Sequence, residues 1–407
     1  MVGAVSVDAE GSTPLAGVVV VDLTRYVAGS YTSMLLASLG AVVIKVEDPV
    51  KGDPYRGQGT ITVGGESALF LGLNNGKQSL ALNLKEPEGR LILESLLERA
   101  DVLVENSRPG SLDALGLSFP QVHDRFPGVV YVSISGYGSE GSRATKGGFD
   151  LTLQAASGIM SVTGTADGGP TKVGVPMMDI GSALCACVGV ASALLQRTHT
   201  GVGTWVRTSL FEFGLATMTS IVSSISATGE TPGRLGSHSP SFAPYGAFRT
   251  ATDYITLAGA GNENLWRKLC QCVGLPELVD DPRFASNADR ITHRDELTDL
   301  LEVALAAQPA DEWIDILDQS GVPAETVASI PDVLASPDTA ALKLLQTMTI
   351  DGQDYVSVAP PFSLGDRPTY SSPAPHLGQH TRMILGQLGF DATAIDDLTT
   401  RGIVAGR

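Results

Sequence analysis

Residues 15–48 read LAGVVVVDLTRYVAGSYTSMLLASLGAVVIKVED, and this stretch decides the fold. Two runs of apolar, mostly β-branched residues, 18–21 and 41–46, enclose a segment, 29–40, whose apolar side chains recur at helical spacing. Buried strands of a parallel sheet form continuous apolar runs, and the connection between two such strands is usually a helix. The stretch therefore predicts a strand, a helix and a second, parallel strand.

The same alternation continues along the first half of the chain. The pattern predicts strands at 78–84, 101–106, 128–138 and 204–210, and a helix at 86–100 with Pro87 in its first turn. Two more helices are expected, one near 150–159 and one from Asp179 to about Arg197. Helices alternating with continuous apolar strands indicate an α/β fold with a parallel sheet covered on both faces. We expect a large Rossmann-like domain whose first part spans 1–224.

The composition changes near residue 225. Gly, Ser, Pro and Thr dominate 227–246, which predicts a linker or a binding loop, and 247–261 resembles a hairpin that ends in a glycine loop. Short amphipathic helices follow to about 335, so 225–335 is predicted to be a smaller α+β domain. The segment 336–407, with a hairpin at 348–364 and a helix at 377–390, is expected to return to the large domain.

The composition limits the classes of partner. With 43% hydrophobic and 17% charged residues, a chain of 407 residues is expected to fold, in two domains. A formal net charge of -17 argues against nucleic acid and against an anionic membrane surface. No apolar run was expected to reach the length of a membrane span.

The cysteines and histidines predict no metal site. Cys185/Cys187 and Cys270/Cys272 are two residues apart in helical segments, where their side chains diverge, so all four are expected to pack in the core. The six histidines are scattered without ligand spacing. Reduced cysteines and the lack of a secretory signal give a cytoplasmic location as the expectation. The turn at 24–31 lacks the glycines of a dinucleotide-binding loop, and no phosphate-loop or serine-hydrolase motif occurs.

Asp179 is the main candidate for chemistry. It directly precedes a long helical pattern, where free N–H groups and a partial positive charge would keep its carboxylate ionised, and small Gly181 and Ser182 would leave space beside it. An accessible carboxylate can act as a nucleophile, but aspartate is also a common helix N-cap, which spacing alone favours. Asp150 presents the same choice. In the second half, the N–H groups of 258–262 could contact a ligand, and Arg234 or His238 could bind an anion.

Ordered segments over nearly the whole chain resemble the class III CoA-transferase family. They are 15–56, 73–89, 102–117, 131–141, 147–164, 179–203, 243–266 and 376–385. The resemblance implies a Rossmann-like large domain, a small domain and a homodimer of two interlocked ring-shaped chains. It also implies that Asp179 is the nucleophile, which attacks an acyl-CoA thioester to form an aspartyl anhydride and then an aspartyl-CoA thioester, from which a carboxylic acid acceptor takes the CoA. No cofactor other than coenzyme A, as substrate and product, is then needed.

The resemblance also assigns further residues. The loop that shields the intermediate falls on Gly259, Ala260 and Gly261, and an arginine that contacts the nucleotide in one relative is replaced by Ala114. Asp150, Arg234 and His238 are expected near the substrate. The expected CoA contacts are Arg25, Tyr26, Ala28, Leu82, Lys85, Asn106 and Arg108, of which Lys85 and Arg108 suit phosphate by charge.

Two alternatives remain open. The α-methylacyl-CoA racemases share the fold, but the histidine they use as a second base is Phe149 here, and a phenyl ring cannot relay a proton. The chain could also bind CoA esters without catalysis, with Asp179 only as a cap. Within the transferases, 234–248 resembles the loop of members that use succinyl-CoA and glutarate, which favours a dicarboxylate substrate with Arg234 or His238 near its distal carboxylate.

Overall fold

The structure, a computed structural model, describes residues 13–258 and 262–406. The chain divides into a large unit and a small unit, and its path passes between them four times. The large unit contains the described residues up to Ser157, then Gly174–Thr217 and the segment from Pro337 onward, and the small unit contains Gly158–Val173 and Met218–Ser336. The boundaries drawn from the sequence gave Gly158–Val173 to the large domain. The structure differs because this segment bonds to the loop near residue 235, for instance through the N–H of Gly236 to the carbonyl oxygen of Gly164 at 2.8 Å.

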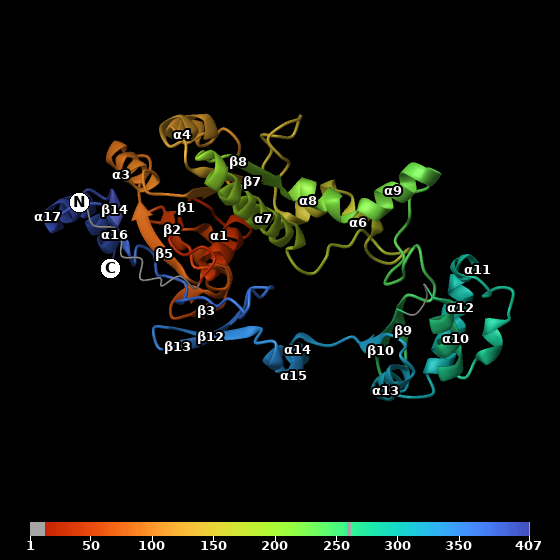
Figure 1. The fold of residues 1–407 in the computed structure, drawn as a ribbon. Helices are drawn as coiled ribbons and strands as arrows, with labels where there is room; N and C mark the ends of the chain where they lie inside the picture. The colour runs from red at the N-terminus through yellow and green to blue at the C-terminus, as the bar shows by residue number, and fades with distance from the viewer. Residues whose placement is uncertain (1–12, 259–261, 407) are drawn as a thin grey trace. The chain divides into compact units, whose positions relative to one another are not determined.

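A seven-stranded sheet forms the centre of the large unit (Figure 1). Its order is β14, β5, β2, β1, β6, β7, β8, and all neighbours are parallel except β14, which runs antiparallel to β5. The strands are β1 (Val19–Asp22), β2 (Val42–Glu47), β5 (Lys77–Leu82), β6 (Val102–Glu105), β7 (Val130–Ser135), β8 (Trp205–Ser209) and β14 (Val404–Ala405). The predicted parallel sheet is confirmed. Its strand order reverses between β1 and β6, where sheets of this kind bind ligands beyond the carboxyl ends of the strands.

Helices cover both faces of this sheet. On one face, α3 (Pro87–Leu97), α4 (Phe119–Arg125), α16 (Thr381–Gln387) and α17 (Ala392–Thr400) bury leucine, isoleucine and valine side chains against the strands. On the other, α1 (Ala28–Ser38) packs on β1 and β2, and α7 (Met177–Thr200) packs on β7 and β8. Pro87 opens α3, as predicted, since the first helical position needs no N–H.

Helix α7 is long and apolar enough to cross a membrane by length and composition, contrary to our expectation that no segment would be. In the structure it is a helix of the large unit, packed against α1, β8 and the short helices α5 (Asp150–Ala156) and α8 (Leu210–Thr217). Its buried side is made of small residues such as Ala183 and Ala186, which let α1 approach closely.

Shorter elements complete the large unit. Two hairpins, β3 with β4 and β12 with β13, contact each other through β3 and β13. The predicted hairpin at 348–364 is confirmed in β12 and β13. The elements are η1 (Pro54–Gly57), β3 (Thr62–Val63), β4 (Glu66–Ser67), α2 (Ala68–Leu71), η2 (Asp113–Leu115), α15 (Pro337–Ala341), β12 (Leu345–Ile350) and β13 (Gln353–Val358).

The small unit has its own core around a three-stranded sheet of order β11, β10, β9. The predicted hairpin is confirmed in β9 (Gly246–Arg249) and β10 (Tyr254–Leu257), which are antiparallel. Trp266 and Trp313 are buried in this core, and the guanidinium of Arg290 lies 4.9 Å from the Trp266 ring. The other elements are α6 (Ile159–Val162), α9 (Thr219–Thr228), α10 (Glu263–Cys272), η3 (Pro276–Val279), α11 (Asn287–Thr292), α12 (Arg294–Leu305), α13 (Ala310–Ser320), β11 (Ala324–Thr326) and α14 (Ile330–Ala335).

Candidate active site

The turn after β1 contains the first group of predicted CoA contacts. Arg25 and Tyr26 follow β1, and α1 begins at Ala28. The side chain of Asn106, which follows β6, holds this turn from the neighbouring strand. Its Oδ1 accepts the N–H of Arg25 at 2.9 Å, and its Nδ2 donates to the carbonyl oxygen of Arg25 at 2.6 Å. These four residues therefore meet at the point where the strand order reverses.

A cavity of about 100 Å³ lies beside the turn. Arg25, Leu82 and Lys85 contribute to its lining, so three of the predicted CoA residues come together there. Arg25 and Lys85 are exposed and supply positive charge, whereas the side chain of Leu82 is only 1% exposed. Leu82 can thus offer a ligand its backbone and little else.

Arg108 lines a larger cavity of about 660 Å³ at the carboxyl ends of β6, β7 and β8. The two cavities adjoin, since Ser107 lines both. A Cβ atom at Gly147 would lie 2.9 Å from Nε of Arg108, so the guanidinium rests against the segment that leads into Asp150. The volume of the larger cavity is in the range of sites for small molecules and cofactors.

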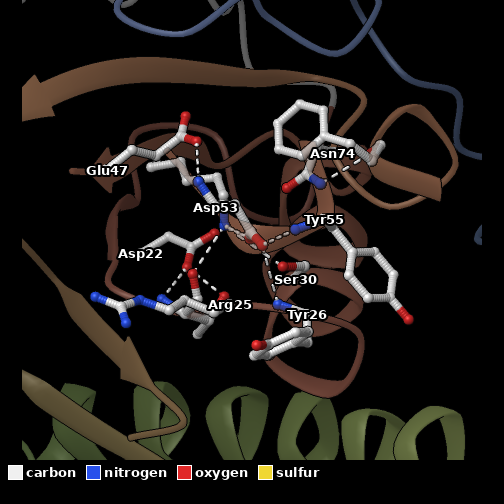
Figure 2. A network of polar contacts seen from close by, with 12 residues as sticks. Asp22, Arg25, Tyr26, Ser30, Glu47, Asp53, Tyr55 and Asn74 are labelled. Carbon is white, nitrogen blue, oxygen red and sulfur yellow. Dashed lines mark hydrogen bonds and ion pairs between the residues drawn. The ribbon is translucent and has the colours of Figure 1, made fainter. Parts of the chain in front are cut away.

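Beneath the turn lies a network of buried charged side chains (Figure 2). Nζ of Lys77 is 3.1 Å from Oδ2 of Asp22, and Nζ of Lys45 is 2.9 Å from Oδ2 of Asp53, with all four side chains at most 1% exposed. Burial alone would raise the pKa of Asp22, but Lys45, Lys77 and two hydroxyl groups lower it to about 2. Removing one member of such a pair leaves an uncompensated buried charge, which is strongly destabilising.

Asp179 lies in the first turn of α7, which begins at Met177 and not at Asp179 as predicted. The helix start is capped by Asp150 of α5, whose Oδ2 accepts the N–H of Met178 at 2.7 Å and that of Asp179 at 3.2 Å. The interpretation of Asp179 as the N-cap is therefore wrong. The two helices pack together, and a carboxylate from one satisfies the free N–H groups of the other.

The carboxylate of Asp179 accepts no hydrogen bond from any residue that the structure describes. Burial, followed by the negative charge of Asp150, raises its pKa to about 7. The expectation that the helix start would keep Asp179 ionised is thus wrong, because Asp150 already occupies the positive end of the helix. With a pKa near neutrality, Asp179 is a stronger base and nucleophile than an ordinary carboxylate.

Gly181 and Ser182 do not provide the space expected beside Asp179. The ring of Phe213, from α8, fills it, since a Cβ atom at Gly181 would lie 1.9 Å from Cζ of that ring. Ser182 is fully buried and its hydroxyl donates to the carbonyl oxygen of Asp179 at 3.1 Å. The small residues serve the packing of α8 on α7, so an acyl group has to approach Asp179 from another side.

Three aromatic side chains connect the turn after β1 with α5. The ring of Tyr26 meets the rings of Tyr55 and Phe149 edge to face, with centroids 5.6 Å apart in both pairs. Phe149 directly precedes Asp150 and is 64% exposed. Desolvation, followed by the charge of Asp179, raises the pKa of Tyr55, so its hydroxyl keeps its proton at neutral pH.

Comparison with known proteins gives the family. The sequence model of CoA-transferase family III matches residues 15–381. The chain belongs to CoA-transferase family III. It is 35% identical over 404 residues to the succinyl-CoA:glutarate CoA-transferase of Mus musculus, covering 98% of this chain and 92% of that one. The acetyl-CoA:oxalate CoA-transferase of Acetobacter aceti is 39% identical over 333 residues, covering 82% and 85% of the two chains.

Solved structures agree with this family membership. A CAIB/BAIF family protein from Brucella suis superposes with a TM-score of 0.82 at 34% identity, covering 92% of this chain and 99% of that one. Rv3272 from Mycobacterium tuberculosis does so with a TM-score of 0.82 at 29% identity and the same coverage. The family III resemblance predicted from sequence is thereby confirmed, and the protein is a CoA-transferase.

Other residues predicted for the family III site lie in the small unit. The guanidinium of Arg234 donates to the carbonyl oxygens of Thr165 at 3.1 Å and Gly168 at 2.7 Å, so it ties two segments of that unit together. Burial, followed by the charge of Arg294, lowers the pKa of His238. A neutral imidazole is a weak partner for an anion, which counts against the predicted role of His238. The loop residues Gly259, Ala260 and Gly261 lie outside the described residues, and their role stays a prediction.

Sequence analysis missed the ion pairs and Tyr55. The signal was a lysine inside each of two apolar strands, VVIKVE and KQSLAL, because a lysine is almost never fully buried without a charged partner. The identity of each partner was not readable, since Asp22 and Lys77 are 55 residues apart in the chain.

The cysteines and metal-binding side chains need one correction. Cys270 is buried and Cys187 and Cys272 are partly buried, but Cys185 is exposed on α7, so the expectation that all four lie in the core is wrong for Cys185. Among residues 13–258 and 262–406, no three His, Cys, Asp or Glu side chains cluster as metal ligands would.

Proposed function

We propose that the enzyme moves CoA from succinyl-CoA to a dicarboxylic acid. The support is the range of relatives that pair succinyl-CoA with such an acid. Besides the glutarate enzyme, the succinyl-CoA--D-citramalate CoA-transferase of Chloroflexus aurantiacus is 35% identical over 324 residues, covering 80% of this chain and 81% of that one. Family membership gives the reaction type, and the names of these relatives support the proposed substrate class.

Asp179 is the nucleophile in this proposal. The observation that carries it is a carboxylate of raised pKa that accepts no hydrogen bond from residues 13–258 and 262–406. An oxygen of Asp179 attacks the thioester carbonyl, the C–S bond breaks, and CoA thiolate leaves an aspartyl acyl anhydride. The thiolate then attacks the Asp179 carbonyl carbon, which releases the donor acid as its carboxylate and leaves an aspartyl-CoA thioester. The acceptor carboxylate reverses both steps. No electrons are exchanged, and each covalent intermediate conserves the energy of the thioester.

Asp150 has a positioning role in this cycle. Through the N–H groups of Met178 and Asp179 it fixes the backbone from which the nucleophile projects. Its charge also raises the pKa of Asp179, which strengthens the nucleophile. Both carboxylate oxygens of Asp150 already accept hydrogen bonds, from α7 and from Gln154. The substrate contact expected for Asp150 stays a prediction.

Coenzyme A would bind in the adjoining cavities at the carboxyl edge of the sheet. Lys85 and Arg108 are assigned to its phosphates by charge, and the turn at Arg25, Tyr26 and Ala28 to its main-chain contacts. The shielding of the intermediate by residues 259–261 stays a prediction from the family resemblance.

We also propose that the enzyme is a homodimer. The outward side of α7 presents Leu184, Val188 and Leu195, which are 36%, 68% and 64% exposed, at spacings that place them on one face. A contiguous apolar face is typical of a protein interface. Light scattering after size exclusion should give twice the chain mass for the wild type and a smaller mass for Val188→Asp. Leu91→Asp on α3, where Leu91 is 61% exposed, is the control that should stay dimeric, and a monomeric wild type would contradict the proposal.

Trapping with hydroxylamine tests the nucleophile. After incubation with succinyl-CoA, the reagent should convert the activated Asp179 carboxyl group to a hydroxamate that peptide mass spectrometry locates. Asp179→Asn should yield none and lose transfer by several orders of magnitude, whereas Asp167→Asn, an exposed acid of the small unit, should behave as the wild type. A protein that only binds CoA esters would form no hydroxamate. A racemase would instead exchange the α-proton of 2-methylacyl-CoA with solvent deuterium.

A further inference from the structure

Asp53 holds the backbone of two tyrosines at once. Its Oδ1 accepts the N–H of Tyr55 at 3.0 Å and that of Tyr26 at 3.3 Å (Figure 2). Its Oδ2 pairs with Lys45. Tyr26 has a φ of 63°, in the left-handed region that a residue with a Cβ atom rarely adopts. Such a conformation is strained and persists where the surroundings impose it, often at functional sites. Here the hydrogen bond from the Tyr26 N–H to Asp53 and the two bonds between Asn106 and the Arg25 backbone hold the turn.

The segment that contains Tyr55 is fixed from its other side as well. Oε2 of Glu47 accepts the N–H of Asp53 at 3.0 Å and Nε of Arg56 at 2.8 Å, and the Arg56 guanidinium lies 3.7 Å from the Phe70 ring. The ring of Tyr55 packs against the buried cluster of Phe70, Leu71, Ile350 and Ala374. Backbone and ring are thus both held, so the position of the Tyr55 hydroxyl is set by the fold.

Burial and nearby negative charges keep that hydroxyl protonated. The charges of Asp179, Asp53 and Asp150 all disfavour ionisation of Tyr55, and no described residue makes a hydrogen bond with its hydroxyl. The edge-to-face contacts from Tyr55 to Tyr26 and on to Phe149 connect it to the residue before Asp150. Tyr55 is therefore a neutral hydrogen-bond donor that the fold holds in place and that Tyr26 and Phe149 link to the start of α5.

We propose that Tyr55 contacts the substrate and donates a hydrogen bond to the distal carboxylate of the dicarboxylic acid, while the other carboxyl group reacts at Asp179. Asp53 is the positioning residue for this donor. The proposal rests on Asp179 as the nucleophile. A second carboxylate next to Asp150 and Asp179 meets two like charges, so it needs a donor that stays protonated. A hydrogen bond to a charged group contributes about 1.5–3 kcal/mol, which corresponds to roughly tenfold or more in binding.

Tyr55→Phe tests the hydroxyl, with two acceptors that differ only at the distal end. Glutarate has a distal carboxylate, and pentanoate has a methyl group in its place. With succinyl-CoA as donor, we expect the variant to raise the KM for glutarate by on the order of tenfold and to leave kcat/KM for pentanoate within about twofold. Tyr31→Phe is the matched control. Tyr31 is also a partly buried tyrosine of raised pKa, but the charge that acts on it is that of Cys187. Tyr31→Phe should therefore leave the KM and kcat/KM for both acceptors unchanged.

A double-mutant cycle tests the positioning role of Asp53. Asp53→Asn keeps an oxygen for the two N–H groups but removes the ion pair with Lys45. It should reduce the preference for glutarate over pentanoate, and the double variant with Tyr55→Phe should lose no more preference than Tyr55→Phe alone. A purely structural role would instead lower the rates with both acceptors alike. If Asp53→Asn does not fold, the Tyr55→Phe comparison alone still decides whether Tyr55 contacts the substrate.

The two proposals fail in different ways. Equal losses for glutarate and pentanoate in Tyr55→Phe, or no loss for either, would overturn the role of Tyr55. If that kinetic result is obtained while the hydroxamate still forms at Asp179 in the variant, only the Tyr55 contact is refuted and the role of Asp179 as nucleophile is kept. No hydroxamate in the wild type would overturn the proposed function itself, and the Tyr55 proposal with it.

Discussion

Replacing Asp150 by asparagine separates the two effects of this side chain on Asp179. The amide oxygen can still accept the N–H groups of Met178 and Asp179, but the negative charge is gone. In the wild type, two causes raise the pKa of Asp179 from 3.8 to about 7, burial first and Asp150 second. The smaller cause supplies at most half of this rise, so its removal should lower the pKa by about 1 and at most about 1.6.

The assay is kcat/KM for succinyl-CoA between pH 5 and 9, because this quantity reports ionisation in the free enzyme. We expect the wild-type rate to rise with pH to a plateau, with a midpoint near 7, and the midpoint of Asp150→Asn to lie near 6. Asp167→Asn is the control for a change in overall charge and should leave the midpoint in place. A midpoint of Asp150→Asn that stays near 7 or rises would refute the electrostatic role of Asp150.

Three further variants or conditions test other parts of the structure. Because the pKa of Asp179 is raised, the wild type loses stability as pH rises from 3.8 through 7. In urea unfolding, Asp179→Asn should therefore be more stable than the wild type at pH 8, by about 2–4 kcal/mol, and equal to it near pH 3.5. Asp22, with its pKa lowered to about 2, stabilises the fold above pH 3.8, and about 2 kcal/mol of unfolding free energy should be lost as pH falls toward 2. An acid titration monitored by fluorescence should show this loss in the wild type and not in Asp22→Asn. Gly181→Ala should displace the Phe213 ring and reduce transfer at least tenfold. Gly386→Ala, where a Cβ atom meets nothing within 4 Å, should leave activity unchanged. Normal activity in Gly181→Ala would contradict the packing described for α8.

The sheet was predictable because its strands are continuous apolar runs. Each predicted strand of the large sheet is present apart from small shifts at its ends, and the hairpins at 246–257 and 345–358 follow their alternating patterns. The two-residue strand β14 gave no such signal, since a strand of this length has no periodicity. The return of Gly158–Val173 to the small unit depends on hydrogen bonds between distant segments, which no local pattern records.

The site was predictable in its residues but not in their relations. Asp179 and Asp150 were both recognised as residues at helix starts, yet the sequence favoured two separate caps. The structure has one carboxylate capping the helix of the other. Because of that arrangement the pKa of Asp179 is raised, whereas the sequence argument about helix charge predicted that the helix start would keep Asp179 ionised. Tyr55 was missed because its position depends on the hydrogen bond from its N–H to Asp53 and on the pairing of Asp53 with Lys45 of β2, which no local pattern records.

The antiparallel pairing of β14 with β5 has a consequence during synthesis. Strand β5 ends at Leu82 and β14 begins at Val404, so 321 residues lie between them. At about 5–20 residues per second, a ribosome needs roughly 16–64 s to cover that interval. During this time the outer edge of β5 has no strand beside it, and unpaired strand edges promote association between chains. The large unit therefore completes its sheet only after β14 has been synthesised, which makes the nascent chain, and not the finished enzyme, the form most in need of a chaperone.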